Sequence, residues 1–89
     1  MEWNRKIAIR FAKEEGIVLN KMHWKIIYLV RKFYKKYNFF PSDKMLVSFI
    51  KKRFGKQFGS SIYLFKLFSF NANKKIKKIA GIPNSKVCF

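Results

Sequence analysis

The sequence predicts an all-α fold: a small bundle of about five helices, including a helix-turn-helix-like pair, that ends in a flexible C-terminal arm. Apolar residues recur at helical spacings, capping residues precede these stretches, and no stretch alternates apolar and polar residues as a strand would. With 89 residues, 49% of them hydrophobic, residues 1–89 form one domain. We expect a folded body over about residues 3–80 and a mobile arm over residues 81–89.

The first helix is predicted over residues 4–15. Asn4 can cap it, and Gly16 supplies the left-handed conformation at which many helices end. Trp3 is expected to pack onto its core-facing side. That side, at spacings of three and four residues, consists of Ile7, Ala8, Phe11 and Ala12.

A longer second helix is predicted from the cap Asn20 to about Tyr37. Its wide apolar face is typical of a core helix, although exposed rings could also stack on nucleobases. His23 is expected to be half-exposed beside Trp24 rather than catalytic, because no Asp, Ser or second Cys lies at a suggestive spacing. The expected core stripe is Ile26, Val30, Phe33 and Tyr37, flanked by Trp24, Ile27, Arg31 and Tyr34.

A third helix is predicted from Ser42 to about Phe54, after a turn that contains Pro41. Together with the second helix it resembles a helix-turn-helix, the motif on which a nucleic-acid-binding function would depend. Its acidic start at Asp43 and the absence of evident base-reading side chains count against that function. Gly55 ends the helix, and its predicted buried face is Met45, Leu46, Phe49 and Ile50.

A fourth helix, capped by Ser60 or Ser61, is predicted to run to about Phe68 after a loop at residues 56–59. It is apolar nearly all round and is expected to be the most buried element. Its apolar residues are Ile62, Leu64, Phe65, Leu67 and Phe68.

A short fifth helix is predicted over about residues 73–80, and Gly81 ends it where the arm begins. Its inward residues are Ile76, Ile79 and Ala80, and its outward residues are Lys74, Lys75, Lys77 and Lys78.

The net charge of +17 at pH 7 would suit contact with a nucleic acid or an anionic surface. The basic residues are mostly lysines scattered through every segment, beside many Ile, Phe, Asn and Tyr, a mixture that an AT-rich genome favours. Contact with RNA and compositional drift therefore both remain open as explanations. No apolar run approaches the roughly 18 residues of a membrane span, and no signal peptide begins the chain, so we expect a soluble, cytoplasmic protein.

The single cysteine, Cys88, is the penultimate residue. One cysteine excludes an internal disulfide and any multi-cysteine zinc site, and a free reactive thiol suits a reducing compartment. Gly81 and Pro83 interrupt any helix that could carry the thiol into the core, so Cys88 is expected to be exposed on the arm. Residue types alone leave open whether this thiol is merely tolerated or reactive. We predict neither a cofactor nor a metal ion.

Several short sequence segments, together with their order along the chain, resemble the DsrC/TusE family of sulfur carriers. The arm reads Ala-Gly-Ile-Pro at residues 80–83 and ends in a penultimate cysteine, as that family's arm does. Family members carry a further N-terminal segment before the tryptophan that corresponds to Trp3. The resemblance covers nearly the whole chain, and its upstream landmarks are residues 15–20, 23–24, 30–34, 37–38, 41, 45–47 and 63–68.

The resemblance implies a sulfurtransferase that works as a persulfide relay. DsrC proteins of dissimilatory sulfite reduction have a second arm cysteine where this chain has Lys78, so the single Cys88 points to the TusE branch. TusE-like proteins accept sulfur from a TusBCD-like complex and pass it to an MnmA-like tRNA thiouridylase, for 2-thiolation of the wobble uridine. Cys88 would carry the persulfide, with Gly81, Pro83 and Lys86 as supporting arm residues. Contact with tRNA itself would be indirect or weak.

The competing hypothesis is a basic helix-turn-helix-like module that binds nucleic acid and carries an incidental cysteine. Such a module would bind RNA without any partner protein.

Overall fold

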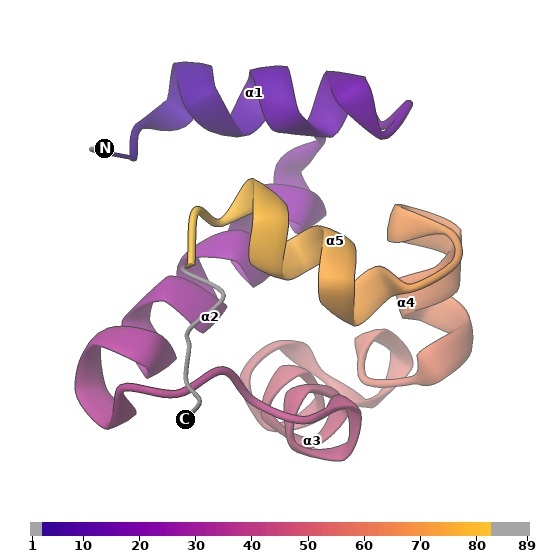
Figure 1. The fold of residues 1–89 in the computed structure, drawn as a ribbon. Coiled ribbons are helices and arrows are strands. Elements are labelled where there is room, and N and C mark those ends of the chain that lie inside the picture. The colour runs from indigo at the N-terminus through magenta and orange to yellow at the C-terminus, as the bar shows by residue number, and fades with distance from the viewer. Residues whose placement is uncertain (1–2, 83–89) are drawn as a thin grey trace.

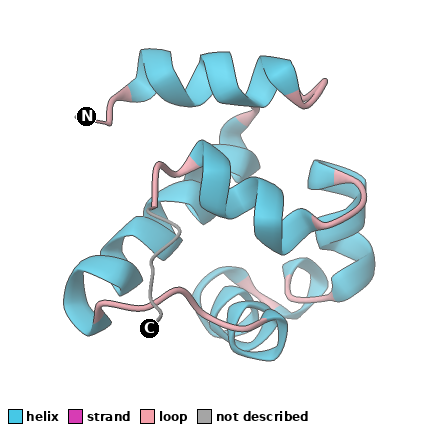
Figure 2. Cartoon of the chain, viewed as in Figure 1, coloured by secondary structure: helices cyan, strands magenta, loops and turns pink. Residues whose placement is uncertain are grey.

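Five α-helices and one 3₁₀ turn make up residues 3–82, the part of the chain that the computed structural model describes (Figures 1 and 2). No strand occurs among these residues. This confirms the predicted all-α fold. The elements are α1 (Arg5–Glu14), α2 (Lys21–Tyr37), α3 (Asp43–Phe54), η1 (Lys56–Phe58), α4 (Ser61–Phe68) and α5 (Ala72–Ile79).

Helix α5 occupies the middle of the bundle, where it packs against α1, α2 and α4 (Figure 1). Its residues Ile76 and Ile79 are completely buried, as is Ala80 at its end. They join a core formed by Ala8, Ala12, Ile26, Ile27, Val30, Leu46, Ile50, Leu64, Phe68 and Ile82. Because α5 is central, the residues that directly follow it, as far as Ile82, still pack against the body.

Side-chain caps begin four of the helices, as the sequence predicts. The Asn4 side chain accepts from the Ile7 N–H, and the Asn20 side chain accepts from those of Met22 and His23. The other two caps are Ser42, which accepts from Met45 N–H, and Ser60, which accepts from Tyr63 N–H. These bonds satisfy amide groups that have no partner inside the helix.

The turn between α2 and α3 begins at Asn38, whose left-handed backbone (φ 62°) ends α2. Phe33 of α2 meets Phe49 of α3 with ring centroids 5.1 Å apart. The two helices form the predicted helix-turn-helix-like pair. Tyr37, which we placed in the core stripe, is instead half-exposed, because it lies in the last turn of α2.

His23 is buried, so the prediction of a half-exposed side chain is wrong. Its Nδ1 accepts the Asn20 N–H at 3.0 Å, and this leaves the proton on Nε2, which donates to the Leu67 carbonyl at 2.6 Å. The ring edge also packs on Phe68, with centroids 4.8 Å apart. Both nitrogens are therefore occupied in joining α2 to α4, which supports a structural role.

Helix α4 is not the most buried element, contrary to our prediction. Leu64 and Phe68 point into the core, whereas Ile62 is 72% exposed and Phe65 is 49% exposed. An eight-residue helix that packs mainly on α5 and η1 buries only one side. The apolar composition of its other side therefore does not imply burial.

We expect Phe68→Ala to destabilise the fold by about 3 to 5 kcal/mol, since it removes a completely buried ring and leaves a cavity. Phe65→Ala should cost only about 1 kcal/mol, because the half-exposed ring loses mainly its edge-on contact with Phe70. Urea midpoints of the two variants test this. Equal losses would contradict the observed orientation of α4.

Candidate functional site

Of the predicted site residues, Gly81 alone lies within the described part of the chain. Cys88, Pro83 and Lys86 lie outside the described residues, and so does the predicted mobility of the arm. What can be examined is the point from which the cysteine-bearing segment departs, residues 79–82, which we call the arm root. Gly81 and Ile82, which we assigned to the arm, pack against the body, and Ile82 is only 8% exposed.

The arm root is a glycine-dependent helix end. The Gly81 N–H donates to the Lys78 carbonyl and the Ile82 N–H donates to the Lys77 carbonyl, each at 3.1 Å. With Gly81 in the left-handed region (φ 71°), this is the Schellman arrangement, in which the second residue after the helix packs back on it. The buried Ile82 is that residue, so the chain direction is fixed as far as position 82.

Trp3 closes over the arm root from the other end of the sequence. Its indole Nε1–H donates to the Ile79 carbonyl at 2.8 Å. A Cβ atom at residue 81 would lie 2.3 Å from Trp3 Cδ1, which is far inside van der Waals contact. Glycine is therefore required at this position both for its backbone conformation and for the close approach of the indole ring.

Arg31 of α2 completes the contacts at the arm root. Its guanidinium donates to the Ala80 carbonyl and lies 4.0 Å above the centroid of the Trp3 ring. Burial lowers the pKa of Arg31 below its ordinary value, but a guanidinium stays charged at neutral pH. A cation is favourable here, because the end of a helix carries partial negative charge. We placed Arg31 in a helical stripe without giving it a role. The feature of the sequence that could have indicated a role is that Arg31 is the one charged residue in this stripe.

An open groove of about 830 Å³ runs beside the arm root. It is lined by Tyr28, Arg31, Lys32, Tyr34, Lys35, Asn38, Gly81 and Ile82. Among the described residues no carboxylate lines this groove, and Arg31, Lys32 and Lys35 make it positively charged. Positive surroundings favour the anionic form of a nearby thiol or of any other acidic group.

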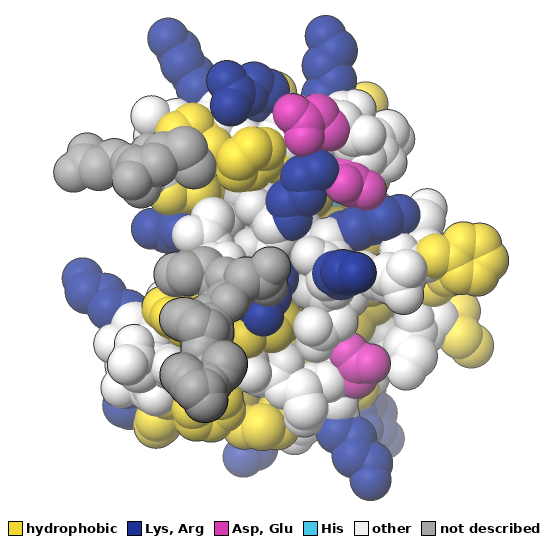
Figure 3. All heavy atoms as spheres, viewed as in Figure 1, with side chains coloured by type: hydrophobic (Ala, Val, Ile, Leu, Met, Phe, Trp, Pro, Cys, Tyr) yellow, Lys and Arg dark blue, Asp and Glu magenta, His cyan; other side chains and the backbone are white. Residues whose placement is uncertain are grey.

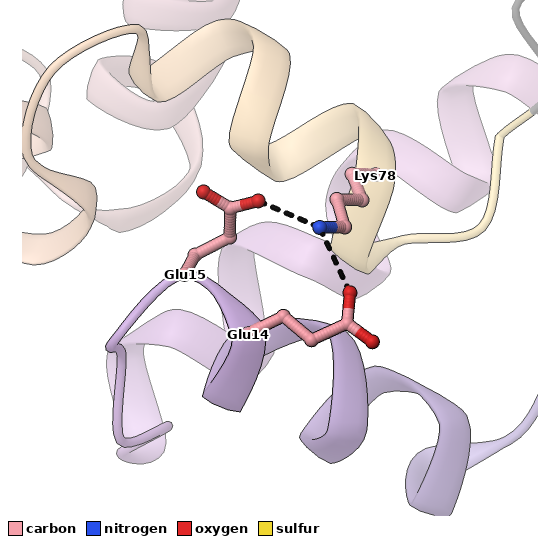
Figure 4. A network of polar contacts seen from close by, with 3 residues as sticks. All are labelled: Glu14, Glu15 and Lys78. Atoms are coloured by element: carbon pink, nitrogen blue, oxygen red, sulfur yellow. Dashed lines mark hydrogen bonds and ion pairs between the residues drawn. The ribbon is translucent and has the colours of Figure 1, made fainter.

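Lys78 joins α5 to the end of α1 (Figure 4). Its Nζ lies 2.6 Å from Glu15 Oε2 and 3.0 Å from Glu14 Oε1. The hydrogen bond from Lys78 lowers the pKa of Glu15, and that bond together with the one to Glu14 raises the pKa of Lys78. The lysine at this position is thus committed to a contact between helices.

Within residues 3–82, no group of three or more His, Cys, Asp or Glu side chains is placed to hold a metal ion. In the same part of the chain, none of the helices is both long and apolar enough to cross a membrane.

Comparison with known proteins gives a consistent result. The family model described as "DsrC like protein" matches residues 1–89. Sulfurtransferase TusE of Buchnera aphidicola from Acyrthosiphon pisum is 51% identical over 87 residues, which cover 98% of this chain and 76% of that protein. Sulfurtransferase TusE of Photorhabdus laumondii is 40% identical over 98% of this chain and 78% of its own length.

A solved structure agrees with these sequence matches. The NMR structure of Allochromatium vinosum DsrC has a TM-score of 0.87 and 32% sequence identity, and the match covers 99% of this chain and 79% of that one. The five-helix bundle is therefore the fold of a solved DsrC protein. The chain belongs to the DsrC-like family, and the predicted family is confirmed.

Two glycines with nearly the same backbone angle provide a matched test of the arm root. Gly16→Ala, at φ 72° with open space around the new methyl group, should cost about 1 to 2 kcal/mol for the left-handed conformation alone. Gly81→Ala should cost about 1 to 3 kcal/mol more, because the methyl group collides with Trp3. Urea midpoints measure both losses, and the indole N–H resonance of Trp3 should shift only in Gly81→Ala. Equal losses and an unmoved resonance would contradict the described contact.

The ion pair at Lys78 predicts a pH-dependent stability. Because the pKa of Glu15 is lowered in the folded state, its contribution is fully present above the unfolded value of about 4.3 and is lost as the pH falls through the lowered pKa. Lys78→Gln should therefore be less stable than the unsubstituted protein at neutral pH, and the difference should shrink in acid. Urea midpoints over a pH series measure this, with Lys74→Gln on the same helix as control. A difference independent of pH would contradict the pairing.

Proposed function

We propose that Cys88 carries sulfur as a persulfide, accepted from a TusBCD-like complex and delivered to an MnmA-like thiouridylase for 2-thiolation of the tRNA wobble uridine. The sulfur-transfer function itself follows from the sulfurtransferase relatives and confirms the prediction. The observation that supports the detailed proposal most is the convergence of family membership with a single cysteine in the segment that leaves the arm root.

The chemistry needs a nucleophilic thiolate that can reach two partners. The Cys88 thiolate attacks the outer sulfur of a donor persulfide, the sulfur–sulfur bond of the donor breaks, and the donor cysteine leaves as a thiolate. The product is a Cys88 persulfide, and a second exchange of the same kind passes the outer sulfur to a cysteine of the acceptor. Sulfur moves without net oxidation, so this relay needs no cofactor.

An ordinary thiol pKa is sufficient for this role. A thiol with a pKa of about 8.5 is a few per cent ionised at pH 7, and a higher pKa makes the thiolate intrinsically more nucleophilic. Fully extended, the segment from Pro83 to Cys88 would span on the order of 20 Å, which is enough to enter a partner's active site. Because the arm root is fixed, this segment would start from a defined position on the body.

Lys78 supports a relay rather than an internal redox cycle. A disulfide within the chain needs two cysteines, and this sequence has one. The position that holds the second arm cysteine in DsrC proteins of sulfite reduction is occupied here by a lysine paired with Glu14 and Glu15. The sulfur on Cys88 must therefore be transferred to another molecule.

We expect Cys88→Ser to abolish sulfur transfer completely, because a hydroxyl cannot hold sulfane sulfur and no other cysteine in the chain can replace it. Transfer of labelled sulfur from the donor complex to the thiouridylase and tRNA should fall to the level measured without carrier. The thermal midpoint should be unchanged, and the variant should compete with the unsubstituted carrier for the donor. Carrier-dependent thiolation above that blank would refute the persulfide mechanism.

A further inference from the structure

A row of exposed cations follows the groove between α2 and α3. We call it the basic track and define it as Lys25, Lys32 and Lys36 of α2 with Lys52 and Arg53 of α3. These residues line two adjoining hollows of about 330 and 240 Å³. Lys32 lines both hollows and also the groove beside the arm root. The track therefore continues to the point where the cysteine-bearing segment leaves the body.

The acidic residues of the described chain lie elsewhere. Glu14 and Glu15 are paired with Lys78, and Asp43 stands at the start of α3, where it lines a different hollow. Figure 3 shows acidic side chains on the face that carries α1 and α5. No carboxylate lines the hollows of the basic track, and its cations form no ion pair within residues 3–82. Cations also lie on the face that carries α1 and α5, as Figure 3 shows, but along the groove of the basic track no described carboxylate accompanies them.

Tyrosine rings lie among these cations. Tyr28 stands between the arm-root groove and the track, and Tyr37 lines the far hollow. Both are half-exposed, and each ring packs on another aromatic ring of the body. Tyr28 contacts Trp3 edge-on and stacks on Trp24, while Tyr37 packs on Phe33. An aromatic ring in a fixed position can stack on an unpaired base while the neighbouring cations contact the phosphate backbone.

We propose that the basic track binds RNA, with its cations on the phosphate backbone and Tyr28 or Tyr37 stacked on unpaired bases. This inference rests on the proposed function and extends it: the carrier contacts the RNA that is to be thiolated while Cys88 delivers sulfur to the enzyme. The track is mostly lysines, which bind phosphate groups as point charges, so the contact is independent of sequence, weak and dependent on salt.

Charge alone would also suit an anionic membrane or an acidic protein, but the shape and composition of the track favour RNA. Its apolar side chains, Leu29, Phe33 and Phe49, are partly or fully buried in the groove, so the groove lining itself offers little apolar surface to insert into lipid. The exposed rings at its margins, Tyr28 and Tyr37, with Phe39 packed beside Tyr37, can stack on bases.

Two triple variants of equal charge test the proposal. One removes track cations (Lys25→Gln, Lys32→Gln and Lys52→Gln), and the other removes exposed cations on α1 and α5 (Lys6→Gln, Lys13→Gln and Lys74→Gln). Each is titrated into a fluorescently labelled tRNA transcript at several salt concentrations, and circular dichroism checks folding. The track variant should bind at least about tenfold more weakly, with a salt slope shallower by about 2 to 3, and the control should stay within about threefold.

Three results would overturn the proposal. Equal losses in both triple variants would mean that net charge, not the track, binds RNA. An unchanged affinity in the track variant would exclude the track directly. Unchanged RNA binding together with lost binding to the donor or acceptor protein would make the track a protein-docking surface.

The RNA measurement is separate from the sulfur measurement. All titrations are made in the Cys88→Ser background, which cannot carry sulfur but keeps the whole body, and this background should bind RNA as the unsubstituted chain does. Loading of Cys88 by inorganic polysulfide is then measured by mass in the track variant with Cys88 intact, and should be normal. A failure of RNA binding would therefore leave the persulfide proposal standing, and a failure of loading would leave the track standing.

Discussion

The contact made by Trp3 and Arg31 with the end of α5 is the interaction on which the arrangement of this protein depends. The last carbonyl groups of a helix have no partner inside it. Here the Ile79 carbonyl accepts from Trp3 and the Ala80 carbonyl accepts from Arg31, while the guanidinium lies over the indole ring. Three segments that are distant in the sequence thus form one unit. That unit fixes the place and direction in which the chain leaves the body at Ile82.

The parts of this fold that depend on local hydrogen bonds could be predicted from the sequence. The caps Asn4, Asn20, Ser42 and Ser60 and the helix-ending Gly16, Gly55 and Gly81 act within a few residues of themselves, so the helix boundaries followed from residue type. The predictions that were wrong concerned side chains whose surroundings depend on residues distant in the sequence. His23 is buried with its Nε2–H donating to the Leu67 carbonyl, and the apolar outer side of α4 remains exposed because no other element of the described chain covers it. The role of Arg31 was missed for the same reason: Trp3 and Ala80 are far from it in sequence.

Charge shows most clearly what the fold adds to the composition. The sequence left open whether an excess of lysine reflects a partner or compositional drift. In the fold, the described carboxylates cluster with Lys78 or stand at the start of α3, while α2 and α3 present cations and tyrosines along a groove that reaches the arm root. The composition explains many lysines, and the fold adds their arrangement along a groove that no described carboxylate lines. One end of the body thus combines a fixed departure point for the chain with a surface suited to polyanions.

The central claim is that the Sγ atom of Cys88 holds the transferred sulfur. The most direct test is the mass of the intact protein, and of its C-terminal peptide, after incubation with a cysteine desulfurase, its relay proteins and isotopically labelled cysteine. We predict one added labelled sulfur per chain, located on the peptide that contains Cys88 and removed by a thiol reductant. A chain that supports thiolation of tRNA while its Cys88 peptide gains no labelled sulfur would contradict the account.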